Sequence, residues 1–152
     1  MYKKIVGSIT LGMLISSLAA CNSEGEPKVE TTSSNTCALD VINGERGALV
    51  RLKSGVVDFR GWAADFATST APATLQLVFK DNEGRSYPFE SSLRYERPDV
   101  VKAYKQDAFL KSGFSVKADI SSLKPGAYGV VVKMIDGNRV VVCPIKKNII
   151  VE

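Results

Sequence analysis

The sequence predicts an all-β sandwich that begins at Cys37 and continues to the C-terminus. Short segments of alternating apolar and polar residues follow one another along this region, and turn-forming residues separate them. Cys37 and Cys143 stand at the start of the first segment and at the end of a late one. About seven short strands with turns between them are typical of two packed antiparallel sheets.

The alternation assigns an inner face to each strand. Val57 and Phe59 alternate until Gly61 interrupts the pattern, so we expect a β-bulge at Gly61 that brings Trp62 onto the face of Phe59. The inward-facing residues predicted for later strands are Leu75, Leu77 and Phe79, then Tyr87, Phe89, Leu93 and Tyr95, and then Phe114, Val116, Ala118 and Ile120.

Turn and edge signals separate these strands. Residues 81–84 and 136–138 are predicted hairpin turns, because they combine Asp and Asn with Gly. Pro88 indicates an edge strand, and residues 148–152 are expected to close the last edge of the sheet.

One segment departs from the β pattern. Pro98 stands where a first helical turn would begin, and apolar residues follow it at helical spacing. We therefore expect a short helical excursion near residues 97–105, within a longer connection over residues 94–114.

The N-terminus has the layout of a secretory signal. Residues 1–4 are basic, residues 5–18 are apolar, and the small residues Ala19 and Ala20 precede Cys21. The apolar part is shorter than the roughly 20 residues that a membrane-spanning helix needs. The segment is therefore expected to direct export and not to span the membrane.

Leu18, Ala19, Ala20 and Cys21 resemble the lipobox of bacterial lipoproteins. The resemblance implies that a diacylglyceryl group is attached to the thiol of Cys21, that residues 1–20 are removed, and that the lipid anchors the protein to a membrane. Asn22 in place of an aspartate implies the outer membrane of a Gram-negative host, with the leaflet undetermined. The alternative is an ordinary signal peptide with a chance cysteine.

This assignment divides the chain into three parts. Residues 1–20 are the signal peptide, residues 21–36 hold the lipidated Cys21 and a flexible polar tether, and residues 37–152 form the sandwich. An exported domain folds in an oxidising compartment, where Cys37 and Cys143 are expected to pair. Two free buried thiols are the alternative.

The composition excludes several classes of function. The chain has 20 basic and 16 acidic residues and no histidine, and loss of the signal removes two lysines. The small positive charge that remains does not indicate a nucleic-acid partner, and the commonest general base and metal ligand is missing. We expect no metal, no cofactor and no enzymatic activity.

Three further motifs carry a fold resemblance. Gly61, Trp62 and Asp65 are followed by the motif of residues 97–100, and residues 123–128 then read Leu-Lys-Pro-Gly-Ala-Tyr. The series resembles small immunoglobulin-like sandwich modules of bacterial envelope and glycan-related proteins. The resemblance implies an immunoglobulin-like fold, with a tyrosine corner near the end of residues 123–128.

These observations favour a lipid-anchored, non-catalytic module of the cell envelope that binds or assembles a protein or an envelope polymer such as a glycan. An accessory, pilotin-like subunit of a secretion or assembly machine is the alternative. An enzyme acting on polysaccharide, with carboxylates drawn from Asp65, Glu96 and Asp99, is the third hypothesis.

The helical excursion is the candidate binding site, because functional residues tend to lie on long connections over a rigid scaffold. The alternative is that its apolar residues only cap one end of the core, with Trp62 packed in the core and Arg97 and Asp99 bracing the excursion. Asp65 is a possible partner for Arg97. The candidate binding residues are Arg94, Tyr95, Arg97, Tyr104 and Lys105.

Overall fold

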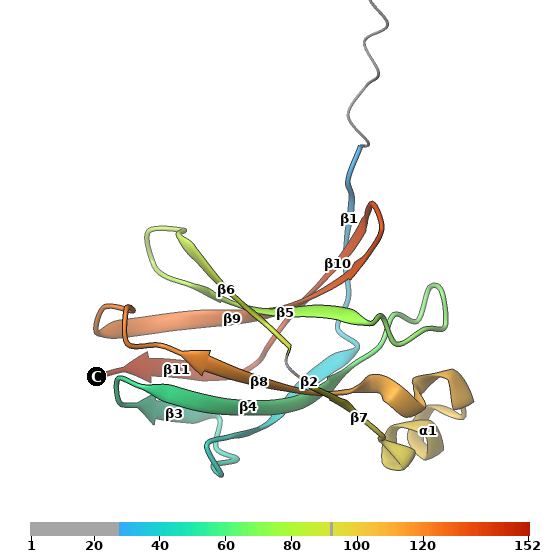
Figure 1. The fold of residues 1–152 in the computed structure, drawn as a ribbon, viewed down its shortest axis with the longest axis horizontal. Coiled ribbons are helices and arrows are strands. Elements are labelled where there is room, and N and C mark those ends of the chain that lie inside the picture. The colour runs from blue at the N-terminus through green and yellow to red at the C-terminus, as the bar shows by residue number, and fades with distance from the viewer. Residues whose placement is uncertain (1–27, 92) are drawn as a thin grey trace, which may run out of the picture.

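The protein is an all-β sandwich, as predicted. The computed structural model describes residues 28–91 and 93–152, and within them eleven strands form a seven-stranded and a four-stranded sheet. The two sheets lie face to face, and a short helix, α1 (Pro98–Tyr104), lies at one end (Figure 1). The predicted signal peptide and Cys21 fall outside the described residues.

The longest strand, β9 (Gly126–Asp136), organises the larger sheet. One side of β9 pairs along its length with β5, while the other side pairs with β11 near its start and with β10 near its end. The outer strands of this sheet are β1, β3 and β6. The bounds are β1 (Glu30–Ser33), β3 (Leu49–Leu52), β5 (Thr74–Lys80), β6 (Ser86–Glu90), β10 (Arg139–Pro144) and β11 (Asn148–Val151).

The smaller sheet has the order β2-β4-β8-β7. All neighbouring strands in this sheet are antiparallel. The bounds are β2 (Cys37–Ile42), β4 (Val56–Ala63), β7 (Leu93–Tyr95) and β8 (Gly113–Asp119).

The main core lies between the two sheets. Phe59 and Phe79 are fully buried and meet edge to face with ring centroids 5.4 Å apart. The residues predicted to face inward in β5 and β8 are buried, because side chains alternate between the two faces of each strand. Burial of this apolar surface is the main source of stability.

The bulge predicted at Gly61 is wrong. β4 alternates without interruption and pairs with β8 in continuous register, so Gly61 faces inward and Trp62 faces outward. The irregularity lies opposite, in β2 between Leu39 and Val41. A Cβ at Gly61 would lie 2.1 Å from the carbonyl oxygen of Ala38, so the glycine permits close strand contact.

Residues 86–95 form two strands and not one. β6 pairs with β5 in the larger sheet, whereas β7 pairs with β8 in the smaller sheet, so the chain crosses between sheets here. Leu93 is 60% exposed as a result, although the alternation places it inward. The prediction that Pro88 lies on an edge strand agrees with β6, whose pairing partner is β5.

Two boundary predictions also need correction. The region predicted as a flexible tether contains β1, which pairs in parallel with β10, so ordered structure begins before Cys37. β11 is not an edge strand, because it lies between β9 and β3. In both cases the partner strand is distant in sequence, and local alternation does not reveal it.

Several other predictions are confirmed. Cys37 and Cys143 form a disulfide across 106 residues, and the hairpin turns join β5 to β6 and β9 to β10. The hydroxyl of Tyr128 donates a hydrogen bond of 2.8 Å to the carbonyl of Lys124, as in a tyrosine corner. Across residues 28–91 and 93–152, no helix has the length and apolar character that crossing a membrane requires.

Candidate functional site

The helical excursion is present where the sequence predicts it. Pro98 occupies the first turn of α1, where backbone N–H groups have no acceptor within the helix, so its lack of an N–H costs no hydrogen bond. Asp99 places a negative charge near the helix N-terminus, where the helix dipole favours it. A 3₁₀ segment, η1 (Asp107–Ser112), follows α1 and returns the chain to β8. Both lie beyond the ends of the strands, at one end of the sandwich (Figure 1).

Arg97 fastens this excursion to the sandwich. Its guanidinium lies 2.7 Å from a carboxylate oxygen of Asp40 and 2.6 Å from one of Asp99, and its side chain is 15% exposed. The hydrogen bond from Arg97 lowers the pKa of Asp99 to about 2, although slight desolvation opposes the shift. Arg97 and Asp99 therefore brace the excursion.

Asp65 is not the partner of Arg97. One of its carboxylate oxygens lies 2.8 Å from Nη1 of Arg139. Asp65 also accepts hydrogen bonds of 3.0 Å from the backbone N–H of Ala67 and from the hydroxyl of Thr68. This buried carboxylate thus organises the connection between β4 and β5. Asp40, which lies at the irregularity in β2, pairs with Arg97 instead of Asp65.

The three carboxylates considered for catalysis are all ion-paired. Asp65 pairs with Arg139, Asp99 pairs with Arg97, and Glu96 lies 2.7 Å from Nζ of Lys111. The Asp65 pair joins the β4–β5 connection to β10, the Glu96 pair joins the start of the excursion to η1, and the Asp99 pair lies within the first turn of the excursion. Within the described part of the chain, no group of three or more acidic or cysteine side chains is arranged to hold a metal ion.

Four aromatic side chains gather at the same end and are called here the aromatic end patch: Trp62, Phe66, Tyr104 and Phe109. They come from the end of β4, the β4–β5 connection, α1 and η1. The ring of Tyr104 lies 5.5 Å from Trp62 and 4.8 Å from Phe66, and Phe66 lies 4.5 Å from Phe109. Aromatic rings at these distances attract one another, and the contacts fix the orientations of the rings.

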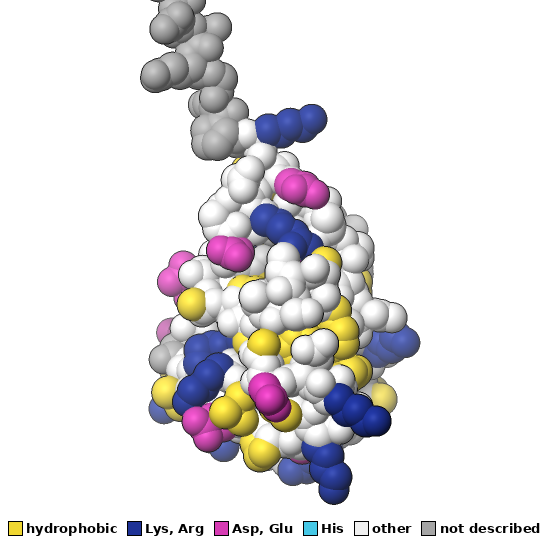
Figure 2. Space-filling model, turned by 90° about the vertical axis from the view of Figure 1, so that its right-hand side faces the viewer, with side chains coloured by type: hydrophobic (Ala, Val, Ile, Leu, Met, Phe, Trp, Pro, Cys, Tyr) yellow, Lys and Arg dark blue, Asp and Glu magenta, His cyan; other side chains and the backbone are white. Residues whose placement is uncertain are grey.

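The patch has a buried base and an exposed top. Phe109 is fully buried with Val100 and Ala64, whereas Phe66 and Tyr104 are 36% and 43% exposed. Leu110, which follows Phe109, is also 36% exposed. Figure 2 shows hydrophobic side chains gathered among Lys and Arg side chains on this face of the molecule. The excursion is therefore partly a cap on the core and partly an exposed apolar surface.

Two of the predicted binding residues belong to the exposed part. Tyr104 ends α1 within the aromatic end patch, and Lys105 follows it, exposed and in the left-handed conformation with φ of 54°. Both side chains are therefore accessible to solvent at this end of the molecule.

The other three predicted binding residues, Arg94, Tyr95 and Arg97, are engaged with the sandwich. Tyr95 lies opposite Gly113, where a Cβ would meet the Tyr95 ring at 2.6 Å, and its hydroxyl donates to the carbonyl of Gly61 at 3.1 Å. Arg97 is held by the two carboxylates described above. Burial raises the pKa of Tyr95. Its side chain contacts β8 at Gly113 and β4 at Gly61, so it connects three strands of the smaller sheet.

Arg94 lies on the same edge strand but opposite Phe114, so its side chain is on the inner side. Its Nη1 and Nη2 atoms are buried and have no hydrogen-bond partner among the described residues. Burial lowers the pKa of the guanidinium. These buried guanidinium nitrogens are not placed to meet a partner at the surface.

The sequence analysis missed Phe66 and Leu110. Phe66 stands in a connection between strands, where strand alternation assigns it no core position. An aromatic residue in such a connection is the signal that could have indicated a functional role. Leu110 carries no comparable signal, because its exposure depends on how η1 docks.

No protein-family model matches this sequence, and comparisons with curated proteins and with solved structures likewise found no match.

Proposed function

We propose that this chain is a lipid-anchored lipoprotein of the bacterial cell envelope and acts as a non-catalytic binding or assembly module. The anchor is supported by the sequence from Leu18 to Cys21, which resembles a lipobox. A lipid with two or three acyl chains gives stable attachment on its own. The folded domain then works at the membrane surface.

The aromatic end patch carries the binding part of this proposal. Phe66 and Tyr104 expose their rings over a base of fully buried Phe109. Exposed aromatic side chains on a rigid base are typical of binding hot spots, because little conformational entropy is lost when they are covered. Arg97 and Asp65 fix the surrounding loops, so the surface is formed before a partner arrives.

The binding proposal is tested by capture from envelopes with matched variants. Lipidated wild-type protein and a Phe66→Ala, Tyr104→Ala variant are purified after crosslinking in cells, alongside a Leu93→Ala control. Leu93 is 60% exposed on β7, away from the patch. We expect the patch variant to lose its crosslinked partner or its retention on cell-wall material, and the control to keep it, with little change in the melting temperature of either.

Equal capture by the patch variant and wild type would contradict the assignment of this surface. Capture of one protein in stoichiometric amount would favour the accessory-subunit alternative, and retention on glycan would favour an envelope polymer. Turnover of a wall or capsule substrate that is lost on Asp65→Asn or Asp99→Asn would instead support the enzyme hypothesis.

The anchor has its own test. Cys21→Ser should prevent labelling by a fatty-acid probe and should leave the signal uncleaved by the lipoprotein peptidase. Conversion of Ser23 to alanine is a matched control that should label normally. Normal acyl labelling of the Cys21→Ser variant would reject the lipoprotein assignment without bearing on the aromatic end patch.

A further inference from the structure

The first strand of the described chain is joined to the sandwich almost entirely through its backbone. β1 has the sequence Glu-Thr-Thr-Ser, and three of its four residues are exposed. The N–H groups of Glu30 and Ser34 donate hydrogen bonds of 2.8 and 2.9 Å to carbonyls of Asn138 and Val142. No β1 residue belongs to the buried apolar core of the described residues.

β10, which β1 covers, has the opposite character. It carries three consecutive valines, and Val141 and Cys143 face the core. Thr32 stands in register with Val141, so a polar side chain occupies the β1 position nearest the apolar interior. Parallel pairing is also slightly weaker per residue than antiparallel pairing. β10 is therefore a strongly β-forming strand covered by a polar strand that buries little apolar surface.

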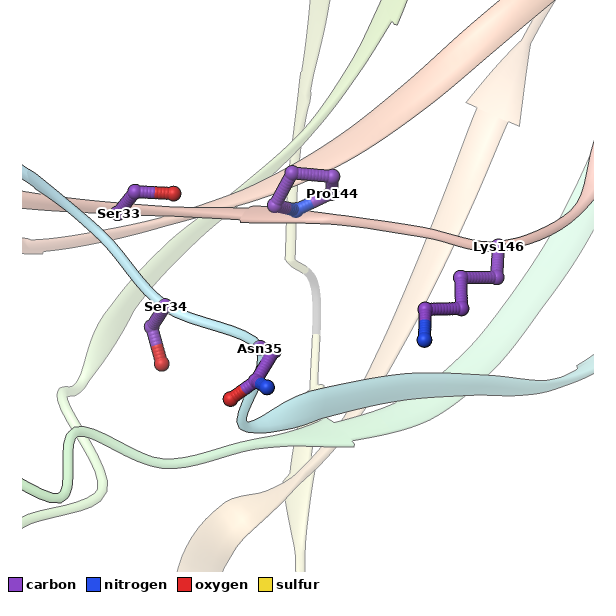
Figure 3. A pocket seen from close by; sticks show the side chains of 5 residues that line it. All are labelled: Ser33, Ser34, Asn35, Pro144 and Lys146. Carbon is purple, nitrogen blue, oxygen red and sulfur yellow. The ribbon is translucent and has the colours of Figure 1, made fainter.

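The chain diverges from β10 after the end of β1. A hollow of about 410 Å³ lies between Ser33, Ser34 and Asn35 on one side and Pro144 and Lys146 on the other (Figure 3). Beyond it, the disulfide holds Cys37 against Cys143. The bridge lies after β1 in the chain, so β1 can leave β10 while the two sheets stay joined.

We propose that β1 is a replaceable strand and that the β10 edge is a second binding surface, separate from the aromatic end patch. Its partner is an extended protein segment with a β-branched apolar residue in the place that Thr32 occupies. Such a segment gains the same backbone hydrogen bonds as β1 and places an apolar side chain, in place of the Thr32 hydroxyl, beside Val141, which is 4% exposed. Strand addition of this kind derives its affinity from the backbone and its specificity from alternate side chains.

Hydrogen exchange on the wild-type protein tests whether β1 opens independently. Backbone groups of alternate residues point to the same side of a strand, so the N–H groups of Val140 and Val142 face β1 and those of Val141 and Cys143 face β9. We expect Val140 and Val142 to exchange at least about tenfold faster. Equal rates for all four amides, at the rate of global unfolding, would overturn the proposal.

A peptide probe tests replacement. The probe is a fluorescent synthetic peptide of residues 28–36 carrying Thr32→Val, added to the full mature protein. By the same alternation the Thr32 N–H faces β10, so Thr32→Pro in the protein removes a ladder hydrogen bond, whereas Thr31→Pro removes an outward N–H and is the matched control. β1 of the protein competes with the probe for β10. Weakening β1 by Thr32→Pro should therefore increase the apparent affinity of the protein for the probe about tenfold.

We expect the Thr32→Pro protein to bind the probe more tightly, the Thr31→Pro protein to behave like wild type, and Val141 and Cys143 to stay protected in both. Absence of probe binding to the Thr32→Pro protein, or equal binding to all three, would refute the assignment. Concentration-dependent dimers of wild type that Thr32→Pro abolishes would identify a second copy of this chain as the occupant, and would also overturn the assignment to a partner segment.

Discussion

The main core and the aromatic end patch differ in how completely the protein encloses them. Phe59, Phe79 and Phe114 of the main core are fully buried between two sheets. In the aromatic end patch Phe109 is fully buried, but Phe66 and Tyr104, which contact one another, are exposed. The patch therefore has a protein layer on one side and solvent on the other.

The difference separates two roles of apolar residues. Sheet hydrogen bonds and strand pairing hold the main core from both sides, so its side chains act on stability. The aromatic end patch is held by loops that ion pairs fasten, at Arg97 with Asp40 and Asp99 and at Asp65 with Arg139. Its exposed rings contribute less to stability and are free for recognition. The following predictions test this distinction.

The largest effect is expected for Gly61→Ala in the main sandwich. Its Cβ would lie 2.1 Å from the Ala38 carbonyl oxygen and 2.9 Å from the Phe114 ring. The strands must separate, so we expect a loss of more than about 4 kcal/mol in the free energy of unfolding. Gly129→Ala is the matched control, because its Cβ would meet Lys80 at an ordinary 3.9 Å. Urea denaturation gives both values, and equal stability of the two variants would refute the close-contact explanation.

Removal of the disulfide should have the next largest effect. The bridge closes a loop of 106 residues between β2 and β10. The chain-entropy argument gives about 4–5 kcal/mol for such a loop, and removal of a native disulfide costs about 2–5 kcal/mol in practice. Thermal unfolding of the Cys37→Ala, Cys143→Ala variant and of reduced wild type should show similar decreases in melting temperature. Free thiols at both positions in protein taken directly from envelopes would contradict the pairing.

Within the aromatic end patch, two phenylalanines should respond differently. Phe109→Ala removes a fully buried ring and should cost about 3 kcal/mol. Phe66→Ala removes a ring that is 36% exposed and should cost below about 1 kcal/mol. Equal losses in urea denaturation would mean that the patch is an ordinary part of the core.

The ion pair at Asp99 should give a small pH dependence. The folded-state pKa of Asp99 is about 2, because Arg97 donates a hydrogen bond to it. A lowered folded-state pKa stabilises the fold above the unfolded value near 4, and this contribution disappears as the pH falls towards about 2. The carboxylate is 64% exposed, so solvent screening limits the contribution to under about 1 kcal/mol.

Asp99→Asn should therefore be less stable than wild type at about pH 6 and equally stable near pH 2, as measured by urea denaturation. Asp107→Asn removes an exposed carboxylate of η1 for which no ion pair is found among the described residues. This control should show no such convergence. A stability difference at Asp99 that does not change with pH would reject the ion-pair explanation.

The smallest expected effect is a gain in stability. Lys105 follows α1 in the left-handed conformation, which glycine adopts without steric cost. Lys105→Gly should raise the free energy of unfolding by about 0.5 kcal/mol, while Lys102→Gly, inside α1, should lower it by about 1 kcal/mol. Thermal unfolding distinguishes the two, and destabilisation by Lys105→Gly would show that its side chain contributes more than its backbone strain costs.

The accuracy of the sequence analysis depended on the range of the interactions. Alternation placed Leu77 and Val116 correctly, since side chains of neighbouring residues point to opposite faces. The hairpins and the tyrosine corner were also predicted, because a few adjacent residues determine them. The candidate site was predicted in place but not in detail: Tyr104 and Lys105 are exposed, whereas Arg94, Tyr95 and Arg97 are engaged with the sandwich.

The sequence by itself determined the β class, the inner face of most strands, the short helix at Pro98 and the two cysteines that pair. The tertiary structure decided which strands are neighbours, that β1 lies on β10, that the irregularity lies in β2 and not at Gly61, and that Arg97 reaches Asp40. Local features follow from the conformations of adjacent residues. Pairings between distant segments depend on how two sheets pack, and a periodic pattern carries no information about which distant segment will be the partner.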